Sequence, residues 1–281
     1  AHSGDGIQAL KDWLLGEARD LKRPPVSGHF RLAVDRAFTL RGAGLVVTGT
    51  AVSGRVQVGD RLLLSPLGRE VRVRSLHAQN TESQQGQEQQ RLALNLVGVD
   101  KDLVRRGDWI LAPDAHAPTD RLDVHVRVPA GDGPALTDRQ PVHVHLGAAD
   151  VTGRLALLEG RRLEPGESGW GQLVLDHQVG AMAGDRFVLR DQSARLTLAG
   201  GRVVDPFAPS RGRRWPERLE TLTALDQPEL AEAWQAALGA AADGLDRAQF
   251  VLAHNLTAAE AAALAGHTAA RTALGQSFSA D

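Results

Sequence analysis

Apolar and polar residues alternate along most of residues 28–115, in short runs separated by turns such as Ser53-Gly54 and Gly59-Asp60. A period of two places successive side chains on opposite faces of a strand, so the runs predict strands with one buried face. These runs are RLAVDRAF, GLVVTGTAV, DRLLLSP, REVRVRSLHA, RLALNLVG and DWILA. Many short strands in succession predict a barrel or a sandwich, and a closed barrel leaves no exposed strand edge.

Residues 120–205 continue with a second set of strand-like runs: RLDVHVRV, PVHVHLG, VTGRLALLE, GWGQLVLD, DRFVLRD and AGGRVVD. The Pro- and Ala-containing stretch at residues 114–120 separates the two sets and predicts a boundary between two β domains. The expected fold is therefore mainly β, with two consecutive barrels.

The pattern is helical near both ends of the chain. Apolar residues recur at helical spacing in residues 6–21, and Pro24-Pro25 ends this helix. One helix cannot bury its apolar face alone, so we expect it to belong to a preceding domain outside this chain. Near the C-terminus, three short helical patterns follow a linker, and Thr257 with Glu260 forms a capping box. The predicted units are residues 1–25, 26–116, 117–206 and 207–281.

The charge of the chain is uneven, although its net charge is only −2. Residues 26–115 carry 12 basic and 9 acidic side chains, a net of +3, whereas residues 216–281 carry 3 and 9, a net of −6. Contacts with phosphate groups are therefore expected on the β domains. Cysteine is absent, which excludes disulfides and thiolate metal sites. Because no apolar run reaches about 18 residues, we expect a cytoplasmic protein without membrane contact.

Three passages carry a resemblance to a known family: AVDRAF at residues 33–38, VRVRSLHAQN at residues 71–80 and RDQSARLTLAGGRVVDP at residues 190–206. They are similar to the selenocysteine-specific elongation factors (SelB type), which are translational GTPases. The opening SGDGIQALKDWLL also resembles the last helix of their GTPase domain. The resemblance implies that the β domains are the translation-factor barrels II and III, and that the helical tail begins a series of winged-helix domains.

The resemblance also implies a function. The intact parent would use GTP and Mg²⁺ to deliver selenocysteinyl-tRNA to the ribosome at recoded UGA codons, and would bind an mRNA hairpin through domains beyond this chain. The selenocysteine pocket would be formed by Asp35, Arg36 and Arg91. A selenol is far more acidic than a serine hydroxyl, and a guanidinium keeps its charge, so arginines favour selenolate over the neutral seryl precursor. Asp35 would orient an arginine and limit the positive charge.

Spacing alone leaves these roles open. Asp35 and Arg36 are neighbours on a strand, so their side chains point to opposite faces unless a bulge intervenes. In the second β domain, three arginines either contact the tRNA backbone or pair with nearby aspartates: Arg190, Arg195 and Arg202.

Two further groups also have alternatives. The linker carries a basic run that is either solvated or in contact with RNA phosphates: Arg211, Arg213 and Arg214. Three histidines could share one region of the second β domain and bind zinc: His125, His143 and His145. Because no further ligand has a suitable spacing, we interpret the histidines as polar positions of a solvated sheet face and predict no metal site.

Two other functions stay open at this point. The chain could come from another translational GTPase, such as a general aminoacyl-tRNA carrier or a protein like initiation factor 2. Alternatively, it could be a β-barrel interaction module that binds no RNA. The arginine pocket and the helical tail favour the selenocysteine-specific type over both.

The sequence contains neither a G-x-x-x-x-G-K-[ST] phosphate loop nor an Asn-Lys-x-Asp guanine-binding motif. A phosphate loop needs backbone N–H groups beside glycines and a lysine on the phosphates, so we predict that this chain alone neither binds nor hydrolyses GTP. Calorimetric titration of the chain with GTP and Mg²⁺ should give no saturable heat. Guanine-specific binding in the micromolar range would contradict the prediction.

Overall fold

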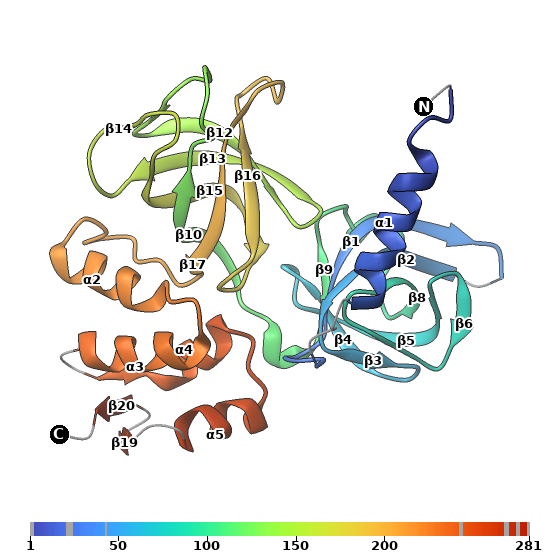
Figure 1. Ribbon diagram of the computed structural model, residues 1–281. Coiled ribbons are helices and arrows are strands. Elements are labelled where there is room, and N and C mark those ends of the chain that lie inside the picture. Colours follow the sequence, from blue (N-terminus) through green and yellow to red (C-terminus); the bar gives the residue numbers. More distant parts are fainter. Residues whose placement is uncertain are drawn as a thin grey trace.

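The computed structural model describes residues 3–20, 25–42, 44–241, 244–266, 270–273 and 276–279. Figure 1 shows two barrels, with helix α1 beside the first barrel and helices α2 to α5 grouped below the second. A helix, two β domains and a helical C-terminal part follow one another as the hydrophobic pattern predicts. Among the described residues, no helix is both long enough and apolar enough to cross a membrane.

The first barrel closes six strands in the order β4-β9-β1-β2-β8-β5, because β5 pairs back with β4. Its strands are β1 (Arg31–Leu40), β2 (Gly44–Ser53), β4 (Arg61–Ser65), β5 (Arg69–Ala78), β8 (Arg91–Val97) and β9 (Trp109–Leu111). The connections contain β3 (Arg55–Gln57), β6 (Thr81–Ser83), β7 (Gln85–Gln87) and the 3₁₀ turns η1 (Lys101–Leu103) and η2 (Pro113–Ala115). Alternate residues such as Leu32, Val47 and Leu94 point inward and are fully buried.

The second barrel closes six strands in the order β10-β15-β13-β12-β16-β17. They are β10 (Pro118–Arg127), β12 (Gln140–Leu146), β13 (Ala149–Leu157), β15 (Ser168–Gly180), β16 (Arg186–Arg190) and β17 (Thr197–Asp205). A small pair, β11 (Leu136–Thr137) with β14 (Arg162–Leu163), forms a separate sheet. The two closed barrels confirm the predicted fold class, and their interiors are filled by apolar side chains.

The helices also follow the sequence pattern, with one exception. Helix α1 (Ile7–Asp20) matches the first prediction, and its apolar side chains remain about half exposed. The C-terminal part contains α2 (Pro216–Leu225), α3 (Leu230–Ala240), β18 (Leu245–Asp246), α4 (Arg247–Ala253), α5 (Ala258–Gly266), β19 (Ala270–Ala273) and β20 (Gln276–Ser279). Helix α2 is absent from the sequence prediction. Its apolar residues are few, and its main signal is Pro216 in the first turn, where proline is well tolerated.

The two barrels meet around Trp109, which is buried against Ala33 of the first barrel and Met182 of the second. The guanidinium of the buried Arg31 lies 4.4 Å from the centre of the Trp109 ring. It also donates to the two carboxylate oxygens of Asp185, at 3.1 and 2.5 Å. A bidentate arginine–carboxylate pair has a fixed geometry, so this contact sets the relative orientation of the barrels.

The corner between α4 and α5 contacts both barrels. The Ala183 N–H donates to the carbonyl oxygen of Ala253 at 2.8 Å, which joins the second barrel to the end of α4. The Asn255 amide nitrogen donates to the carbonyl oxygen of His29 and to the hydroxyl of Ser53, both at 3.0 Å. The helical segment is therefore docked on the ends of β1 and β2.

The predicted capping box is present and contributes to this docking. One Glu260 oxygen accepts hydrogen bonds from the N–H and the hydroxyl of Thr257, at 2.7 and 2.8 Å. The other Glu260 oxygen accepts from the Gly28 N–H at 3.0 Å. Burial raises the pKa of Glu260, but these hydrogen bonds outweigh the effect and lower it, so the carboxylate is charged at neutral pH.

Helix α2 is attached to the second barrel through a buried charge cluster. The Arg218 guanidinium donates to Asp123 at 2.9 and 2.5 Å and to Asp205 at 2.7 Å. Asp123 is fully buried and also accepts from the Gln172 amide at 2.8 Å. Burial raises the pKa of Asp123, and the charge of Arg218 opposes that shift.

Two of the linker arginines are engaged within the chain, which neither alternative from the sequence anticipated. The Arg214 guanidinium donates to the Leu157 carbonyl oxygen at 3.0 and 2.8 Å and to Asp138 at 2.8 Å. Arg213 donates to the Gln172 side-chain oxygen at 3.3 Å. The sequence could not reveal these partners, because they lie about forty to eighty residues away on the second barrel.

Replacing Arg218 by alanine should destabilise the chain by about 3–5 kcal/mol, because it leaves two buried carboxylates without their cation. Urea unfolding followed by circular dichroism measures this change. The matched control is Arg211→Ala, because Arg211 is exposed in the same region. The control should shift the free energy of unfolding by less than about 0.5 kcal/mol. Similar small effects of both variants would contradict a stabilising role for the cluster.

Candidate anion-binding site

A β-bulge interrupts strand β1 at Asp35. The register with β2 shifts between Val34, which faces Gly49, and Arg36, which faces Thr48. Val34 and Ala37 both pack in the core of the first barrel, so the two residues between them lie on the outer face. The bulge therefore places the Asp35 and Arg36 side chains on the same side, which an unbroken strand would not do.

Gly49 allows this close approach of the two strands. A Cβ atom at Gly49 would lie 2.0 Å from the carbonyl oxygen of Ala33 and 2.8 Å from a methyl group of Leu32. Any side chain at this position would push β1 away from β2 beside the bulge. In the sequence VVTGT, Thr48 thus supplies an outward hydroxyl, and Gly49 leaves space for the backbone of the bulged strand β1.

Asp35 binds Arg91 and Thr48. Arg91 Nη1 donates to Asp35 Oδ2 at 2.5 Å, and Nη2 donates to Oδ1 at 3.2 Å. The Thr48 hydroxyl donates to Asp35 Oδ1 at 2.7 Å. Burial raises the pKa of Asp35, but the hydrogen bonds from Arg91 and Thr48 outweigh burial and lower it. Asp35 and Arg91 therefore form an ion pair at neutral pH.

The glutamine-rich turn before Arg91 is anchored to β2. The Ala51 N–H donates to the Gln90 carbonyl oxygen at 3.0 Å, and the Gln89 N–H donates to the Ala51 carbonyl oxygen at 2.8 Å. The Gln90 side chain also accepts from the Gln87 N–H at 2.9 Å. These bonds fix the start of β8 and thereby the position of Arg91.

The Arg36 side chain is exposed, and within the described ranges its guanidinium has no hydrogen-bond or ion-pair partner. Its charge still reaches Asp35, where it contributes to the lowered pKa. The cluster of Asp35, Arg36 and Arg91 thus has a net charge of about +1. Its one uncommitted cation is Arg36, which makes this position suited to a small anion.

Strand pairing places further side chains beside the cluster. Thr48 faces Ala93 on β8, and Ala93 faces His77 on β5. The neighbouring row of outward residues, one two-residue step along the strands, consists of Phe38, Val46, Asn95 and Ser75. The sequence pattern does not reveal His77 or this row as part of the site, because these residues come from strands far apart in the chain.

These two rows line a groove of about 290 Å³, which we call the outer groove. Its lining residues are Phe38, Leu40, Val46, Ser75, His77, Asn80, Ala93 and Asn95. The apolar groove adjoins the charged cluster through Thr48 and Ala93. A ligand with a flat apolar part and an anionic group could occupy both.

The three arginines predicted on the second barrel do not form a single group, because Arg202 lies apart from Arg190 and Arg195. Arg190 lies near the turn of the β16–β17 hairpin and donates to the Arg195 carbonyl oxygen at 3.4 Å. Arg195 is exposed beside it. Arg202 lies at the other end of the hairpin, opposite Arg186, and donates to Asp226 after α2 at 2.6 Å.

Arg202 instead lies on a groove of about 840 Å³ in the second barrel, which we call the arginine groove. Its lining residues are His125, Arg127, Pro129, Gly166, Ser168, Gly184, Arg186, Gly200, Gly201 and Arg202. Gly201 is required for close packing, since a Cβ there would lie 2.1 Å from the His125 carbonyl oxygen. Arg127 and Arg186 could not be found from the sequence, because strand pairing rather than sequence proximity places them beside Arg202.

The three histidines considered as a possible zinc site each lie near a carboxylate. His143 Nδ1 lies 2.9 Å from Asp150 Oδ1, and His145 Nδ1 lies 3.9 Å from the same oxygen. His125 Nδ1 lies 2.9 Å from Asp226 Oδ2. In the part of the chain that the structure describes, no group of three or more histidine, aspartate or glutamate side chains is arranged so that it could hold a metal ion.

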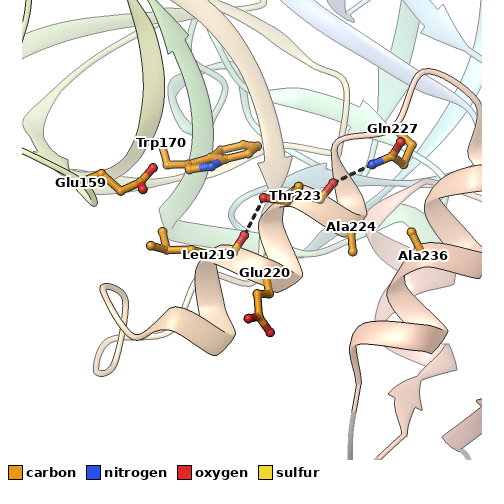
Figure 2. A pocket seen from close by; sticks show the side chains of 8 residues that line it. All are labelled: Glu159, Trp170, Leu219, Glu220, Thr223, Ala224, Gln227 and Ala236. Carbon is orange, nitrogen blue, oxygen red and sulfur yellow. Dashed lines mark hydrogen bonds between the residues drawn. The ribbon is translucent and has the colours of Figure 1, made fainter.

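A hollow of about 440 Å³ lies between the second barrel and helices α2 and α3. Figure 2 shows the side chains that line it. The ring of Trp170 lies above Leu219 and Thr223, and the carboxylates of Glu159 and Glu220 lie at the margin. Acidic side chains repel phosphate groups. Of these two hollows, the arginine groove is therefore the better candidate for an anionic ligand.

Comparisons with known proteins agree along most of the chain. The family profile described as "Selenocysteine-specific elongation factor, beta-barrel domain" matches residues 119–210, and the profile "Elongation factor Tu domain 2" matches residues 44–111. The selenocysteine-specific elongation factor of Escherichia coli (strain K12) is 44% identical over 227 residues, which cover 80% of this chain and 34% of that protein. The corresponding factor of Haemophilus influenzae is 38% identical over 236 residues, covering 82% and 36%.

A solved structure described as bacterial selenocysteine-specific elongation factor EF-Sec is similar to 98% of this chain and 44% of that chain, with a TM-score of 0.73. Its sequence identity is 21%, so this likeness concerns the fold. The chain spans about a third of the length of the curated relatives it matches.

Replacing Arg91 by alanine should raise the pKa of Asp35, because burial remains while the strongest hydrogen bonds to the carboxylate are lost. In the native chain the hydrogen bonds from Arg91 and Thr48 hold the pKa of Asp35 below its ordinary value. The pair therefore stabilises the fold above the ordinary pKa of the carboxyl group, and this contribution is lost as the pH falls through the lowered pKa. Carboxyl NMR titration of Asp35 measures the shift. Arg55→Ala, at an exposed position of β3, should leave the Asp35 titration unchanged. An unaltered pKa in Arg91→Ala would show that Arg91 does not control this carboxylate.

Proposed function

The chain belongs to the family of selenocysteine-specific elongation factors, and from this premise we propose that it is the part of such a factor that binds selenocysteinyl-tRNA. The supporting observation is the cluster of Asp35, Arg36 and Arg91 on the outer face of the first barrel. The tRNA would then be delivered to the ribosome at a recoded UGA codon, in the cytoplasm. GTP and Mg²⁺ would act in the nucleotide-binding domain of the intact protein, whose motifs this chain lacks.

The charge of the cluster supports selection of selenocysteine. Because Asp35 and Arg91 form an ion pair, Arg36 supplies the uncompensated charge. A selenolate would neutralise the cluster, whereas a seryl hydroxyl would leave Arg36 without an anion. A hydrogen bond between charged groups contributes roughly 1.5–3 kcal/mol. This corresponds to a preference of roughly tenfold to a hundredfold for the selenocysteinyl ester.

The outer groove would take the nucleoside that carries the amino acid. Sites for unpaired bases use aromatic and histidine side chains as stacking surfaces, and Phe38 and His77 line this groove. The aminoacyl group would extend past Thr48 and Ala93 to Arg36. This arrangement uses adjacent rows of the same sheet, so it requires no rearrangement of the barrel.

The arginine groove of the second barrel would contact the tRNA backbone. Arg127, Arg186 and Arg202 are exposed along it, and arginine binds phosphate oxygens in a bidentate manner. Arg190 and Arg195 would contribute separately at the hairpin turn. Arg202 has the weakest claim among these residues, because Asp226 already occupies part of its guanidinium.

The helical segment would be the first of the winged-helix domains. Its elements follow the order α3-β18-α4-α5-β19-β20, with a small sheet of β18, β20 and β19. Helix α5 is rich in alanine, and Glu260 near its start binds Gly28 of the first barrel. We therefore assign this helix to packing, and assign recognition of the mRNA hairpin to domains outside the chain.

Two alternative functions can be separated from this one by comparing the binding of selenocysteinyl-tRNA and seryl-tRNA. A general aminoacyl-tRNA carrier would bind selenocysteinyl-tRNA and seryl-tRNA equally well, because it needs no free cation beside the side chain. A β-barrel interaction module would retain neither tRNA. The unpaired Arg36 in a partly compensated cluster favours the selenocysteine-specific function over both.

The Arg36→Ala variant should lose most of the preference for selenocysteinyl-tRNA over seryl-tRNA, because it removes the free cation. The expected loss is roughly tenfold to a hundredfold. Filter binding of both aminoacyl-tRNAs to wild type and variant measures it. Arg41→Ala is the matched control, since Arg41 is exposed just after β1 on the same barrel.

The control should retain the wild-type preference, and circular dichroism should show that both variants are folded. Equal binding of the two tRNAs by the wild-type chain would favour the general carrier. Negligible retention of both would favour the interaction module. A full preference in Arg36→Ala would assign selectivity to another residue.

A further inference from the structure

The hydroxyl of Thr48 occupies a central place in the charged cluster. It donates to Asp35 Oδ1 at 2.7 Å, and its oxygen accepts a longer hydrogen bond from Arg91 Nη2 at 3.4 Å. Thr48 also faces Arg36 across the β1–β2 pair. The side chain therefore contacts or adjoins every charged member of the cluster, although it carries no charge itself.

Both oxygens of the Asp35 carboxylate are engaged. Oδ2 accepts from Arg91, and Oδ1 accepts from Thr48 and, at a longer distance, from Arg91. The Asp35 side chain is 29% exposed, so water has limited access to it. Arg36 is the adjacent residue in the bulge, and its charge already acts on Asp35.

We propose that Thr48 is a positioning residue for selenocysteine selection, which holds Asp35 on Arg91 and thereby keeps Arg36 free for the selenolate. This inference rests on the proposed function of the cluster. Without the hydroxyl, Oδ1 loses its shortest hydrogen bond, and the neighbouring Arg36 is the available replacement donor. Pairing of Arg36 with Asp35 removes the uncommitted cation, because the anion would then have to compete with a fixed carboxylate.

The consequence differs from that of a general loss of stability. Asp35 would divide its oxygens between two arginines, and the cluster would keep its net charge of about +1 without an available guanidinium. Affinity for selenocysteinyl-tRNA falls, while affinity for seryl-tRNA, which makes no use of the cation, stays the same. The signature of Thr48 is therefore a loss of discrimination rather than of tRNA binding.

Thr48→Val tests the inference, because valine keeps the shape and strand preference of threonine and removes only the hydroxyl. Filter binding of selenocysteinyl-tRNA and seryl-tRNA to the full chain should show a preference reduced roughly tenfold. Thr48→Ser restores a hydroxyl and should recover most of the preference. Thr39→Val, at an exposed position of β1 outside the cluster, is the control and should behave as wild type.

A double-mutant cycle with Asp35→Asn separates positioning from a structural role. Asparagine cannot form an ion pair with Arg36, so Thr48→Val should have little further effect on discrimination in that background. An equal effect of Thr48→Val with and without Asp35 would overturn the inference, as would full discrimination in Thr48→Val. A wild-type chain that binds both tRNAs alike would overturn the proposed function and this inference together. If the wild-type chain discriminates and Thr48→Val does so equally well, only the inference about Thr48 fails.

Discussion

The β-bulge at Asp35 is the constraint on which the candidate site depends. A closed six-stranded barrel fills its interior with side chains, so a ligand can be bound only on the outside. Regular alternation would turn either Asp35 or Arg36 toward the core, where an unpaired charge is costly. Because Val34 and Ala37 both remain in the core, one extra residue lies between them and both charged side chains stay outside. Gly49 makes this geometry possible on the facing strand.

Arg36 differs from most arginines described above because its guanidinium is not paired with a carboxylate within the ranges that the structure describes. Arg218, Arg214 and Arg202 bind carboxylates that join the linker and α2 to the second barrel, and they contribute to assembly of the fold. Arg91 is likewise committed to Asp35. A free guanidinium beside a compensated pair is an arrangement that discriminates charge, since the site gains little from a neutral group of similar size.

The sequence predicts the barrels well because the alternation of apolar residues is a local signal that recurs in every strand. It also contains a trace of the bulge, since Val34 and Ala37 are separated by two polar residues, but this spacing alone does not reveal the pairing of Asp35. Cross-strand neighbours such as His77, Arg127 and Arg186 are inaccessible to such reasoning, because register brings together residues that are distant in sequence. The same reason explains the unexpected partners of the linker arginines.

The helical segment, residues 216–266, is connected to the site through strands β1 and β2, because it contacts the ends of the strands that carry the site. Asn255 and Glu260 bind the chain at Gly28, His29 and Ser53, where β1 begins and β2 ends. The same two strands carry Asp35 and Thr48 farther along. Strand β2 is paired on both sides, and β1 is paired with β2 along its length. A site on strands that are paired in this way and held at one end is ordered before the ligand arrives, so binding does not have to supply that order. Loosening of the helical segment would therefore reach the cluster through β1 and β2.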